Sequence, residues 1–492
     1  MHANHRFLGL VSVLLLCGAS HPAAAATGAL DPETLRSRLI GFYRGTAPDP
    51  ARPGSTTEVY HKIIEVAAPQ LGRAVLYHQI ARDGFDSAEP LLQKFYVFGA
   101  LASGPGVLNV VAYAVKPRSL PGNLEQQPRR LAQLTPSALQ TFPTSCALAW
   151  RAGADTGKWV ATPASPRCRY RSATLQRVIV PEFRYDLTPE ALAMRDVLRD
   201  TQGKALFGDA GTLVASRVPA NTMSTIIALS RLAEWRALDP ERLLQLELES
   251  GAIVRLELAP ELAPRAVANI RTLVREKYFD GLVINRVQDN FVAQWGDPGS
   301  TRSLGSASRS LPAEFSRDWQ TTLDVTLLPD PDGYAPQTGF LAGMPVAGDR
   351  AAGRIWGAHC YATVGVGRDN DENSGNGSEL YVVIGHAPRQ LDRNITVVGR
   401  VVQGMDALSS LRRGSGAAGF YETPAERHGI RSMHVAADLP AAQQVRLQAL
   451  RTDSASFAAL IEARRNRRDD WYKLPAGHVD LCNVPLPVRE GP

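Results

Sequence analysis

The stretch LLQLELESGAIVRLEL, residues 243–258, alternates apolar and polar side chains on both sides of a Ser250-Gly251 pair. Alternation with a period of two predicts half-buried strands, and a Gly-containing pair between them predicts a turn, so we expect a β-hairpin. Pro264 follows at the position of a helix first turn, with Val267, Ile270 and Val274 on one face of that helix. The order strand, turn, strand, helix, strand begins an α+β or barrel domain.

Further blocks follow the hairpin in a fixed order. They are APRAVANI (263–270), YFDGLV (278–283), NRV (285–287), FVAQWGDP (291–298), GSELYVVI (377–384), LD (391–392) and VGRVVQGMD (398–406). In order and approximate spacing they resemble the signature segments of cyclophilin-type peptidyl-prolyl cis/trans isomerases. The resemblance implies a closed eight-stranded antiparallel barrel with two flanking helices, and an enzyme that needs no cofactor.

Such an enzyme has to rotate an amide bond that resists rotation by about 18–20 kcal/mol. A donor aimed at the prolyl nitrogen stabilises the twisted amide, and a dry apolar pocket holds the proline ring. The resemblance places Arg286 as the donor, Phe291 as the pocket aromatic, and Gln294 as the side chain that holds substrate or supports the arginine. The other positions to which it assigns substrate binding are Val292, Gly367, Arg368, Glu379, Tyr381 and Leu391.

The chain also departs from the family pattern. Glu379-Leu380-Tyr381 stands where cyclophilins usually have Gln-Phe-Phe, and the carboxylate of Glu379 could pair with Arg286 and draw its charge away. Gln390 stands where tryptophan is usual, Ile395 where histidine or tyrosine is usual, and a longer polar loop follows Arg368. We therefore expect weaker or altered catalysis and poor binding of cyclosporin-type ligands, which a tight cyclosporin complex by calorimetry would contradict.

Short alternating segments broken by Gly, Pro and Asp fill residues 27–219, a pattern that predicts an antiparallel barrel or sandwich. The segments FYRG (42–45), YH (60–61), LYHQ (76–79), QK (93–94), LTP (134–136) and GKALFG (203–208) resemble the CpcT/CpeT-type phycobiliprotein chromophore lyases. That resemblance implies an antiparallel barrel able to hold an apolar or tetrapyrrole ligand. Leu91-Leu92 stands where those lyases tend to carry Tyr-Arg, which argues against bilin handling.

Four cysteines lie beyond the N-terminal segment: Cys146, Cys168, Cys360 and Cys482. An even number favours disulfides in an oxidising compartment, and four cysteines permit three pairings. We favour Cys146 with Cys168 and Cys360 with Cys482, because each pair stays within one proposed domain. A metal site is the weaker interpretation, since no CxxC pair or nearby histidine supports it. The region around Cys360 and Cys482 resembles a periplasmic cyclophilin subgroup whose C-terminal extension is clipped back onto the barrel.

The N-terminus has the layout of a cleaved secretory signal: Arg6, an apolar run over 7–17, and Ala23-Ala24-Ala25-Ala26. The apolar run is too short to be a permanent membrane span, and we expect no integral membrane segment. We therefore predict a periplasmic or secreted protein. The net charge of +6 over 492 residues, with both signs interspersed, does not argue for nucleic acid.

Together these patterns predict a mainly β chain in five parts: a signal peptide at 1–26, a CpcT/CpeT-like barrel at 27–219, a helical linker at 220–240, a cyclophilin-type domain at 241–436, and a partly helical extension at 437–492 packed on that domain. The leading function is isomerisation of X-Pro bonds in unfolded or flexible exported proteins. A catalytically weak binding or chaperone module is the first alternative, and tetrapyrrole binding by the N-terminal barrel is the second.

Overall fold

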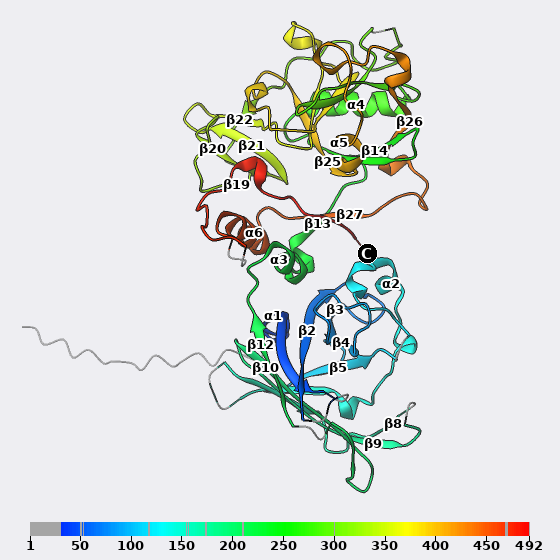
Figure 1. Ribbon diagram of the computed structural model, residues 1–492, viewed down its shortest axis with the longest axis vertical. Helices are drawn as coiled ribbons and strands as arrows, with labels where there is room; N and C mark the ends of the chain where they lie inside the picture. Colours follow the sequence, from blue (N-terminus) through cyan, green and yellow to red (C-terminus); the bar gives the residue numbers. More distant parts are fainter. Residues whose placement is uncertain are drawn as a thin grey trace, which may run out of the picture.

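The computed structural model describes residues 31–491, apart from 50, 51, 53, 117, 118, 154, 156, 173, 174, 209, 210, 300 and 468–470. The predicted signal segment, residues 1–26, lies outside the described residues. Two closed β-barrels follow one another along the long axis, and a thin layer of helix and strand lies between them (Figure 1). No described helix has both the length and the apolar composition needed to span a membrane.

The N-terminal barrel closes through ten antiparallel strands in the order β1-β2-β3-β4-β5-β6-β7-β9-β10-β12, with β12 returning to β1. Helix α1 (Pro32–Leu39) precedes the ring, and α2 (Pro128–Gln133) covers part of its outer face. The strands are β1 (Gly41–Pro48), β2 (Thr56–Val66), β3 (Ala74–Ala81), β4 (Leu92–Phe98), β5 (Leu108–Ala114), β6 (Leu148–Ala152), β7 (Trp159–Pro163), β8 (Tyr170–Arg171), β9 (Val178–Leu187), β10 (Ala191–Arg199), β11 (Ala205–Phe207) and β12 (Leu213–Val218). Two further strands lie outside the ring: β8 pairs with β9, and β11 pairs with β10.

Side chains from opposite walls pack on one another inside this barrel. Tyr43, Leu76, Tyr96, Trp150 and Tyr185 all belong to one buried cluster that fills the lumen. A closed sheet has no free edge, because every strand is paired on both sides. Burial of the apolar side chains on its inner face stabilises the barrel. The ligand that the lyase resemblance implies stays a prediction.

One part of the lumen is polar. His61 Nδ1 lies 3.1 Å from His78 Nε2, and His78 Nδ1 lies 2.9 Å from the Tyr96 hydroxyl. Next to them Lys94 donates to Tyr185 and ion-pairs with Asp196. Burial, with a smaller contribution from the charge of Lys94, lowers the pKa of His61 to about 4, and burial also holds the pKa of His78 well below its usual range. Both imidazoles are therefore neutral at pH 7.

The second barrel closes through eight antiparallel strands in the order β14-β15-β25-β23-β24-β17-β16-β26. Its strands are β14 (Leu243–Leu248), β15 (Ile253–Leu258), β16 (Val283–Val287), β17 (Val292–Gly296), β23 (Thr363–Val366), β24 (Glu379–Val383), β25 (Val397–Gln403) and β26 (His428–Val435). The predicted hairpin is β14–β15, and the predicted helix is α4 (Pro264–Arg275); α5 (Met405–Ser409) is the second helix. The mainly β fold with two barrels is confirmed.

A five-stranded sheet interrupts this barrel between β17 and β23, and the sequence patterns did not predict it. Its order is β18-β22-β21-β20-β19. Its strands are β18 (Arg317–Asp318), β19 (Val325–Leu327), β20 (Gln337–Leu341), β21 (Met344–Asp349) and β22 (Arg354–Gly357). One face packs on the barrel through Leu262 and Val397, while Phe340 and Trp356 enter a separate core with the C-terminal residues.

The C-terminal residues pack against this inserted sheet and the connector between the barrels. Their elements are β27 (Leu447–Leu450), α6 (Ala455–Arg465) and β28 (Val488–Glu490). The connector helix α3 (Met223–Leu229) is shorter than the helical periodicity over 221–238 predicted, because Ser230 ends it and β13 (Trp235–Ala237) pairs with β27. Figure 1 shows α3, α6, β13 and β27 between the two barrels.

Two disulfides join the predicted partners. Cys146 is bonded to Cys168 within the N-terminal barrel region, and Cys360 is bonded to Cys482. The second bridge closes a sequence separation of 122 residues and ties the C-terminal extension to the segment between β22 and β23. The pairing that we favoured is confirmed.

The neutral histidine pair predicts a stability that depends on pH. The folded-state pKa of His61 is about 4, and its unfolded value is about 6.5. Its contribution is therefore complete above about pH 6.5 and is lost as the pH falls toward 4, by on the order of 3 kcal/mol. Urea unfolding between about pH 7 and pH 4, with pulse proteolysis reporting the N-terminal barrel, would measure this loss.

The variant His61→Gln removes the titrating group, so we expect its unfolding free energy to fall less steeply over that range. His386→Gln, at an exposed histidine of the other barrel, is the matched control and should keep the parent's slope. Equal slopes for parent and His61→Gln would contradict the prediction.

Candidate active site

The predicted site residues lie on the outer face of the second barrel, in rows that run across neighbouring strands. Arg286 on β16 is paired with Gln294 on β17, Gln294 with Tyr381 on β24, and Tyr381 with Gly365 on β23. Directly opposed residues of an antiparallel pair project to the same face. The alternate residues Ala293, Trp295, Leu380 and Val382 point inward to the core.

A register shift places Arg286 in this row. The pairing of β16 with β17 slips between Ile284 and Arg286, as in a β-bulge, which re-aims a side chain. Arg286 Nε donates to the carbonyl oxygen of Ala418 at 2.7 Å, and Nη1 donates to Gln294 Oε1 at 3.2 Å. Nη2 donates to Gln288 Oε1. These contacts hold the guanidinium in one orientation.

Two aromatic rings contact the same guanidinium. The centroid of Phe291 lies 5.6 Å from Arg286 Cζ and that of Phe420 lies 5.2 Å from it, both within cation–π range. Burial lowers the pKa of Arg286, but an arginine remains charged at neutral pH. The site therefore holds a half-buried, permanently positive fork of donors.

Glu379 does not pair directly with Arg286 among the ion pairs of the described residues. Gln294 lies between them: its Oε1 accepts from Arg286, and its Nε2 donates to Glu379 Oε2 at 2.9 Å. Burial raises the pKa of Glu379, and the charges of Asp369 and Asp297 add to this, against the hydrogen bond from Gln294. The carboxylate orients the amide of Gln294 so that its oxygen faces the arginine.

An apolar cluster of side chains, which we call the pocket cluster, lies beside the arginine. Val292, Tyr381 and Val383 form a small buried cluster, and Phe291 and Ile395 pack against it. Gly365 lies directly opposite Tyr381, where an added Cβ would come 2.2 Å from the tyrosine hydroxyl oxygen. Glycine at this position therefore provides the space in which the ring of Tyr381 lies flat against β23.

The remaining predicted residues lie around this pocket but do not all join it. Arg368 Nε donates to the carbonyl oxygen of Asn394 at 2.9 Å, so it braces the polar loop against the segment that carries Ile395. A cavity of about 690 Å³ is lined by Arg368, residues 369–371 and Ile395. Gly367 donates its N–H to the carbonyl oxygen of Glu379. Leu391 is half-buried nearby and does not belong to the pocket cluster.

Several contacts of the site were missed by the sequence patterns. Gln288, Ala418 and Phe420 hold Arg286, and His359 bonds to the hydroxyl of Tyr381. Gln288 could have been found, since it lies two residues from Arg286 on the same side of the strand. The other three come from distant segments with no local signal.

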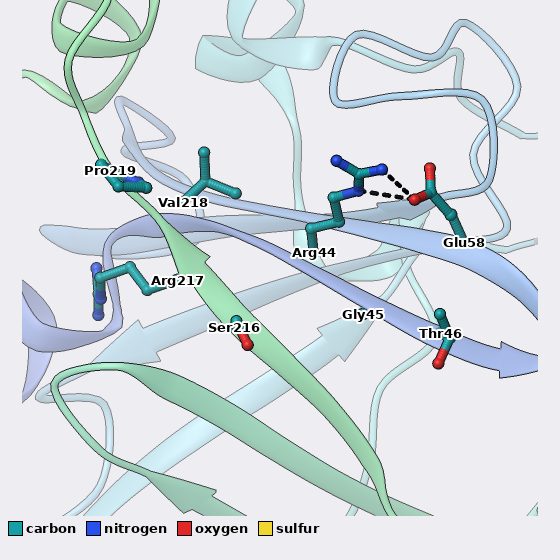
Figure 2. Close-up of a pocket in the computed structure, with 8 residues that line it drawn as sticks. All are labelled: Arg44, Gly45, Thr46, Glu58, Ser216, Arg217, Val218 and Pro219. Carbon is teal, nitrogen blue, oxygen red and sulfur yellow. Dashed lines mark hydrogen bonds and ion pairs between the residues drawn. The ribbon is translucent and has the colours of Figure 1, made fainter.

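A second cavity, of about 370 Å³, lies on the N-terminal barrel between β1, β2 and β12 (Figure 2). Its two arginines are already engaged: Arg44 pairs with Glu58, and Arg217 donates to the carbonyl oxygens of Pro189 and Ile40. Both guanidinium groups therefore donate within the protein, and the charge of Arg44 is balanced by that of Glu58. No group of three or more metal-binding side chains was found in the part of the chain that the structure describes.

Residues 243–435 match the family model described as "Cyclophilin type peptidyl-prolyl cis-trans isomerase/CLD". A protein of Brucella suis named "Probable peptidyl-prolyl cis-trans isomerase" is 32% identical over 190 residues, which are 36% of this chain and 76% of that relative. "Peptidyl-prolyl cis-trans isomerase B" of Bacillus subtilis is 45% identical over 58 residues, which are 12% of this chain and 41% of that protein.

Among solved structures, cyclophilin AquaCyp293 from Hirschia baltica has 29% identity and a TM-score of 0.43 over 52% of this chain and 94% of its own. A cyclophilin type isomerase of Cryptosporidium parvum, crystallised in the presence of the dipeptide ala-pro, has 14% identity and a TM-score of 0.26 over 39% of this chain and 97% of its own. The family match begins at residue 243, so the resemblance of the N-terminal barrel to chromophore lyases is not confirmed.

The close approach at Gly365 gives a structural prediction. A methyl group there would overlap the ring of Tyr381, so we expect Gly365→Ala to displace the ring and lower the unfolding free energy by about 1–3 kcal/mol. Gly333→Ala, where nothing lies within 4 Å of the added carbon, is the control. Thermal unfolding and near-ultraviolet circular dichroism would report both effects. Equal stability of the two variants would contradict the packing described here.

Proposed function

The chain belongs to the cyclophilin-type peptidyl-prolyl cis-trans isomerases, and on that premise we propose that it rotates X-Pro bonds of exported proteins with Arg286 as its main catalytic residue. The observation that carries the proposal is the fixed guanidinium beside an apolar cluster on one face of the barrel, over which we place the proline ring. Peptidyl-prolyl isomerase activity belongs to the chain as a member of this family; the residue roles and the substrates are what we propose.

The geometry suits stabilisation of a twisted amide. As the X-Pro bond rotates, the nitrogen lone pair leaves conjugation and becomes a hydrogen-bond acceptor. A guanidinium has five N–H donors, and three of those of Arg286 donate to Ala418, Gln294 and Gln288. The others are available to the prolyl nitrogen or to a neighbouring carbonyl oxygen. Because the side chain is already oriented, little reorganisation is needed when the transition state forms.

The pocket supplies the second requirement. Phe291, Val292, Tyr381 and Ile395 form the apolar cluster against which the pyrrolidine ring would pack, and burial of that ring would fix the position of the rotating bond. Gln294 is a positioning residue in this scheme, because it acts through Arg286. No bond to the protein forms, so the proposed reaction needs no cofactor.

We place the enzyme outside the cytoplasm as part of the same proposal. The residue pattern of the N-terminus supports export, and two disulfides suit an oxidising compartment. The partners would be unfolded or flexible proline-containing chains. Recovery of the chain from the periplasmic or culture fraction, with its N-terminus removed, would support this; recovery of the intact chain from cytosol would contradict it.

A catalytically weak binding module is the second candidate, and Glu379 favours it. A carboxylate two hydrogen bonds from Arg286 reduces the positive potential that the amide nitrogen meets. In that case the same pocket would hold proline-containing segments without fast turnover. The N-terminal barrel, as a ligand carrier, would be a third role, and absence of binding to bilins or haem would remove it.

Isomerisation of Ala-Xaa-Pro-Phe peptides tests the leading proposal. We expect the mature protein to exceed the uncatalysed rate, and Arg286→Ala to lower kcat/KM by roughly 100-fold, as for loss of a transition-state donor. Arg412→Ala, which removes an exposed arginine paired with Glu426, is the control and should keep full activity. Peptide binding without acceleration would support the binding module instead.

The charge of Glu379 makes a second prediction. We expect Glu379→Gln to raise kcat/KM by about two- to five-fold at neutral pH, because Gln294 keeps a partner while the negative charge is lost. Since burial raises the pKa of Glu379, the carboxyl of the parent is neutralised earlier than usual as the pH falls. The advantage of the variant should therefore shrink toward acid pH.

Glu372→Gln, which removes an exposed carboxylate from the loop that precedes β24, is the matched control and should leave the rate unchanged. Peptide exchange measured by NMR across the pH range would follow all three proteins. A variant that is slower than the parent at every pH would show that the carboxylate assists the reaction.

A further inference from the structure

Tyr381, the floor of the proposed proline pocket, is connected to a buried chain of polar side chains. The hydroxyl of Tyr381 lies 2.8 Å from His359 Nε2, and the two rings are nearly parallel, at 11°. His359 Nδ1 lies 2.9 Å from Asp392 Oδ1, which also accepts the backbone N–H of His359 at 3.0 Å. Since an ionised carboxylate only accepts hydrogen bonds, Nδ1 carries a proton and donates it to Asp392.

The chain continues away from the pocket. Arg389 Nε donates to Asp392 Oδ2 at 2.6 Å, and its two terminal nitrogens donate to Asp332 at 3.0 and 3.2 Å. Asp332 lies in the inserted sheet, between β19 and β20, and also accepts the backbone N–H groups of Tyr334 and Ala335. One unbroken line of hydrogen bonds thus runs from the inserted sheet to the pocket floor.

Every member of this line is removed from solvent. The side chains of His359, Asp392, Arg389 and Asp332 are each at most 5% exposed. Burial alone would raise the pKa of Asp392, but the hydrogen bond from His359 and the charge of Arg389 hold it below its ordinary value. Buried charges and hydroxyls are costly unless every one is paired. The complete pairing seen here therefore fixes each side chain in a single orientation.

The line also anchors the pocket wall. Arg389 and Asp392 flank Leu391, and Ile395, which packs against the pocket cluster, follows three residues after Asp392. Tyr381 lies in the cluster itself, and its hydroxyl would face an apolar pocket unpaired if His359 did not take it. Floor and wall are therefore held by the same set of contacts.

We propose that His359, Asp392, Arg389 and Asp332 are positioning residues, which set the floor and wall of the pocket that receives the proline ring. The inference rests on the proposed use of this pocket for proline-containing peptides. It makes the inserted sheet part of the catalytic apparatus, because Asp332 reaches the pocket through three intervening side chains.

The remote end of the line gives the sharpest test. Asp332→Asn leaves the pocket lining untouched but removes the charge that holds Arg389. We expect KM for Ala-Xaa-Pro-Phe peptides to rise about three- to ten-fold, with kcat within about two-fold of the parent, since binding geometry rather than the donor Arg286 is disturbed. The Kd of the same peptide, from NMR titration, should rise in parallel.

Asp330→Asn is the matched control. Asp330 is equally buried, lies two residues earlier in the same loop, and pairs with Arg465 of the C-terminal extension instead of Arg389. Both variants should lower the melting temperature, but only Asp332→Asn should raise KM. If the two variants bind peptide equally well, the line is a structural element only and the proposal is overturned.

The pocket end is tested by His359→Leu, Tyr381→Phe and their combination. We expect His359→Leu to raise KM, and the double variant to bind no more weakly than this single one, because the two groups act as a pair. Independent, additive losses would overturn the proposal. If the parent binds peptide without turnover, the proposed function fails while the Kd values still decide this inference; if Asp332→Asn matches Asp330→Asn in an active enzyme, only this inference fails.

Discussion

Closure of the two antiparallel sheets is the constraint on which the rest of the molecule depends. In each ring every strand has a partner on both sides, so the backbone donors and acceptors are satisfied without a free edge. Closure also forces the side chains of each strand to divide between a lumen and an outer face. Both lumens are filled with packed side chains, so a substrate-binding site of the second barrel has to lie on its outer face.

The active-site face follows from that division. Trp295 and Val382 fill the lumen, and their sequence neighbours Gln294 and Tyr381 consequently face outward and lie side by side across β17 and β24. The bulge before Arg286 turns the guanidinium toward Gln294. A flat surface of strands would leave these groups exposed; Phe420 from the loop after α5 and Ile395 from the segment after β24 cover them.

Two polar residues at this face would be unfavourable without partners. Glu379 is half-buried and accepts a hydrogen bond from Gln294. The hydroxyl of Tyr381 is hydrogen-bonded to His359 and does not face the apolar cluster. The inserted sheet supports Tyr381 through Asp332, which pairs with Arg389 in the line that leads to His359. The C-terminal extension is tied to the same region by the ion pair of Asp330 with Arg465 and by the bond of Cys482 to Cys360. Buried polar groups destabilise a protein unless they are hydrogen-bonded, and the inserted sheet supplies the partners that complete this network.

The sequence by itself determined what is local or periodic. The alternation over 243–258 and the proline at 264 predict β14, β15 and α4 correctly. Arg286, Phe291 and Gln294 follow from their order in the family's segments, and they meet because β16 pairs with β17 and Phe291 lies between these two strands. Pairing cysteines within one region was also sufficient to predict both disulfides. Only the tertiary structure decided the short α3, the five-stranded sheet, the contact of Arg286 with Ala418 across 132 residues, and the line from Tyr381 to Asp332. Such features depend on segments that are far apart in the sequence, so no local pattern of residue types encodes them.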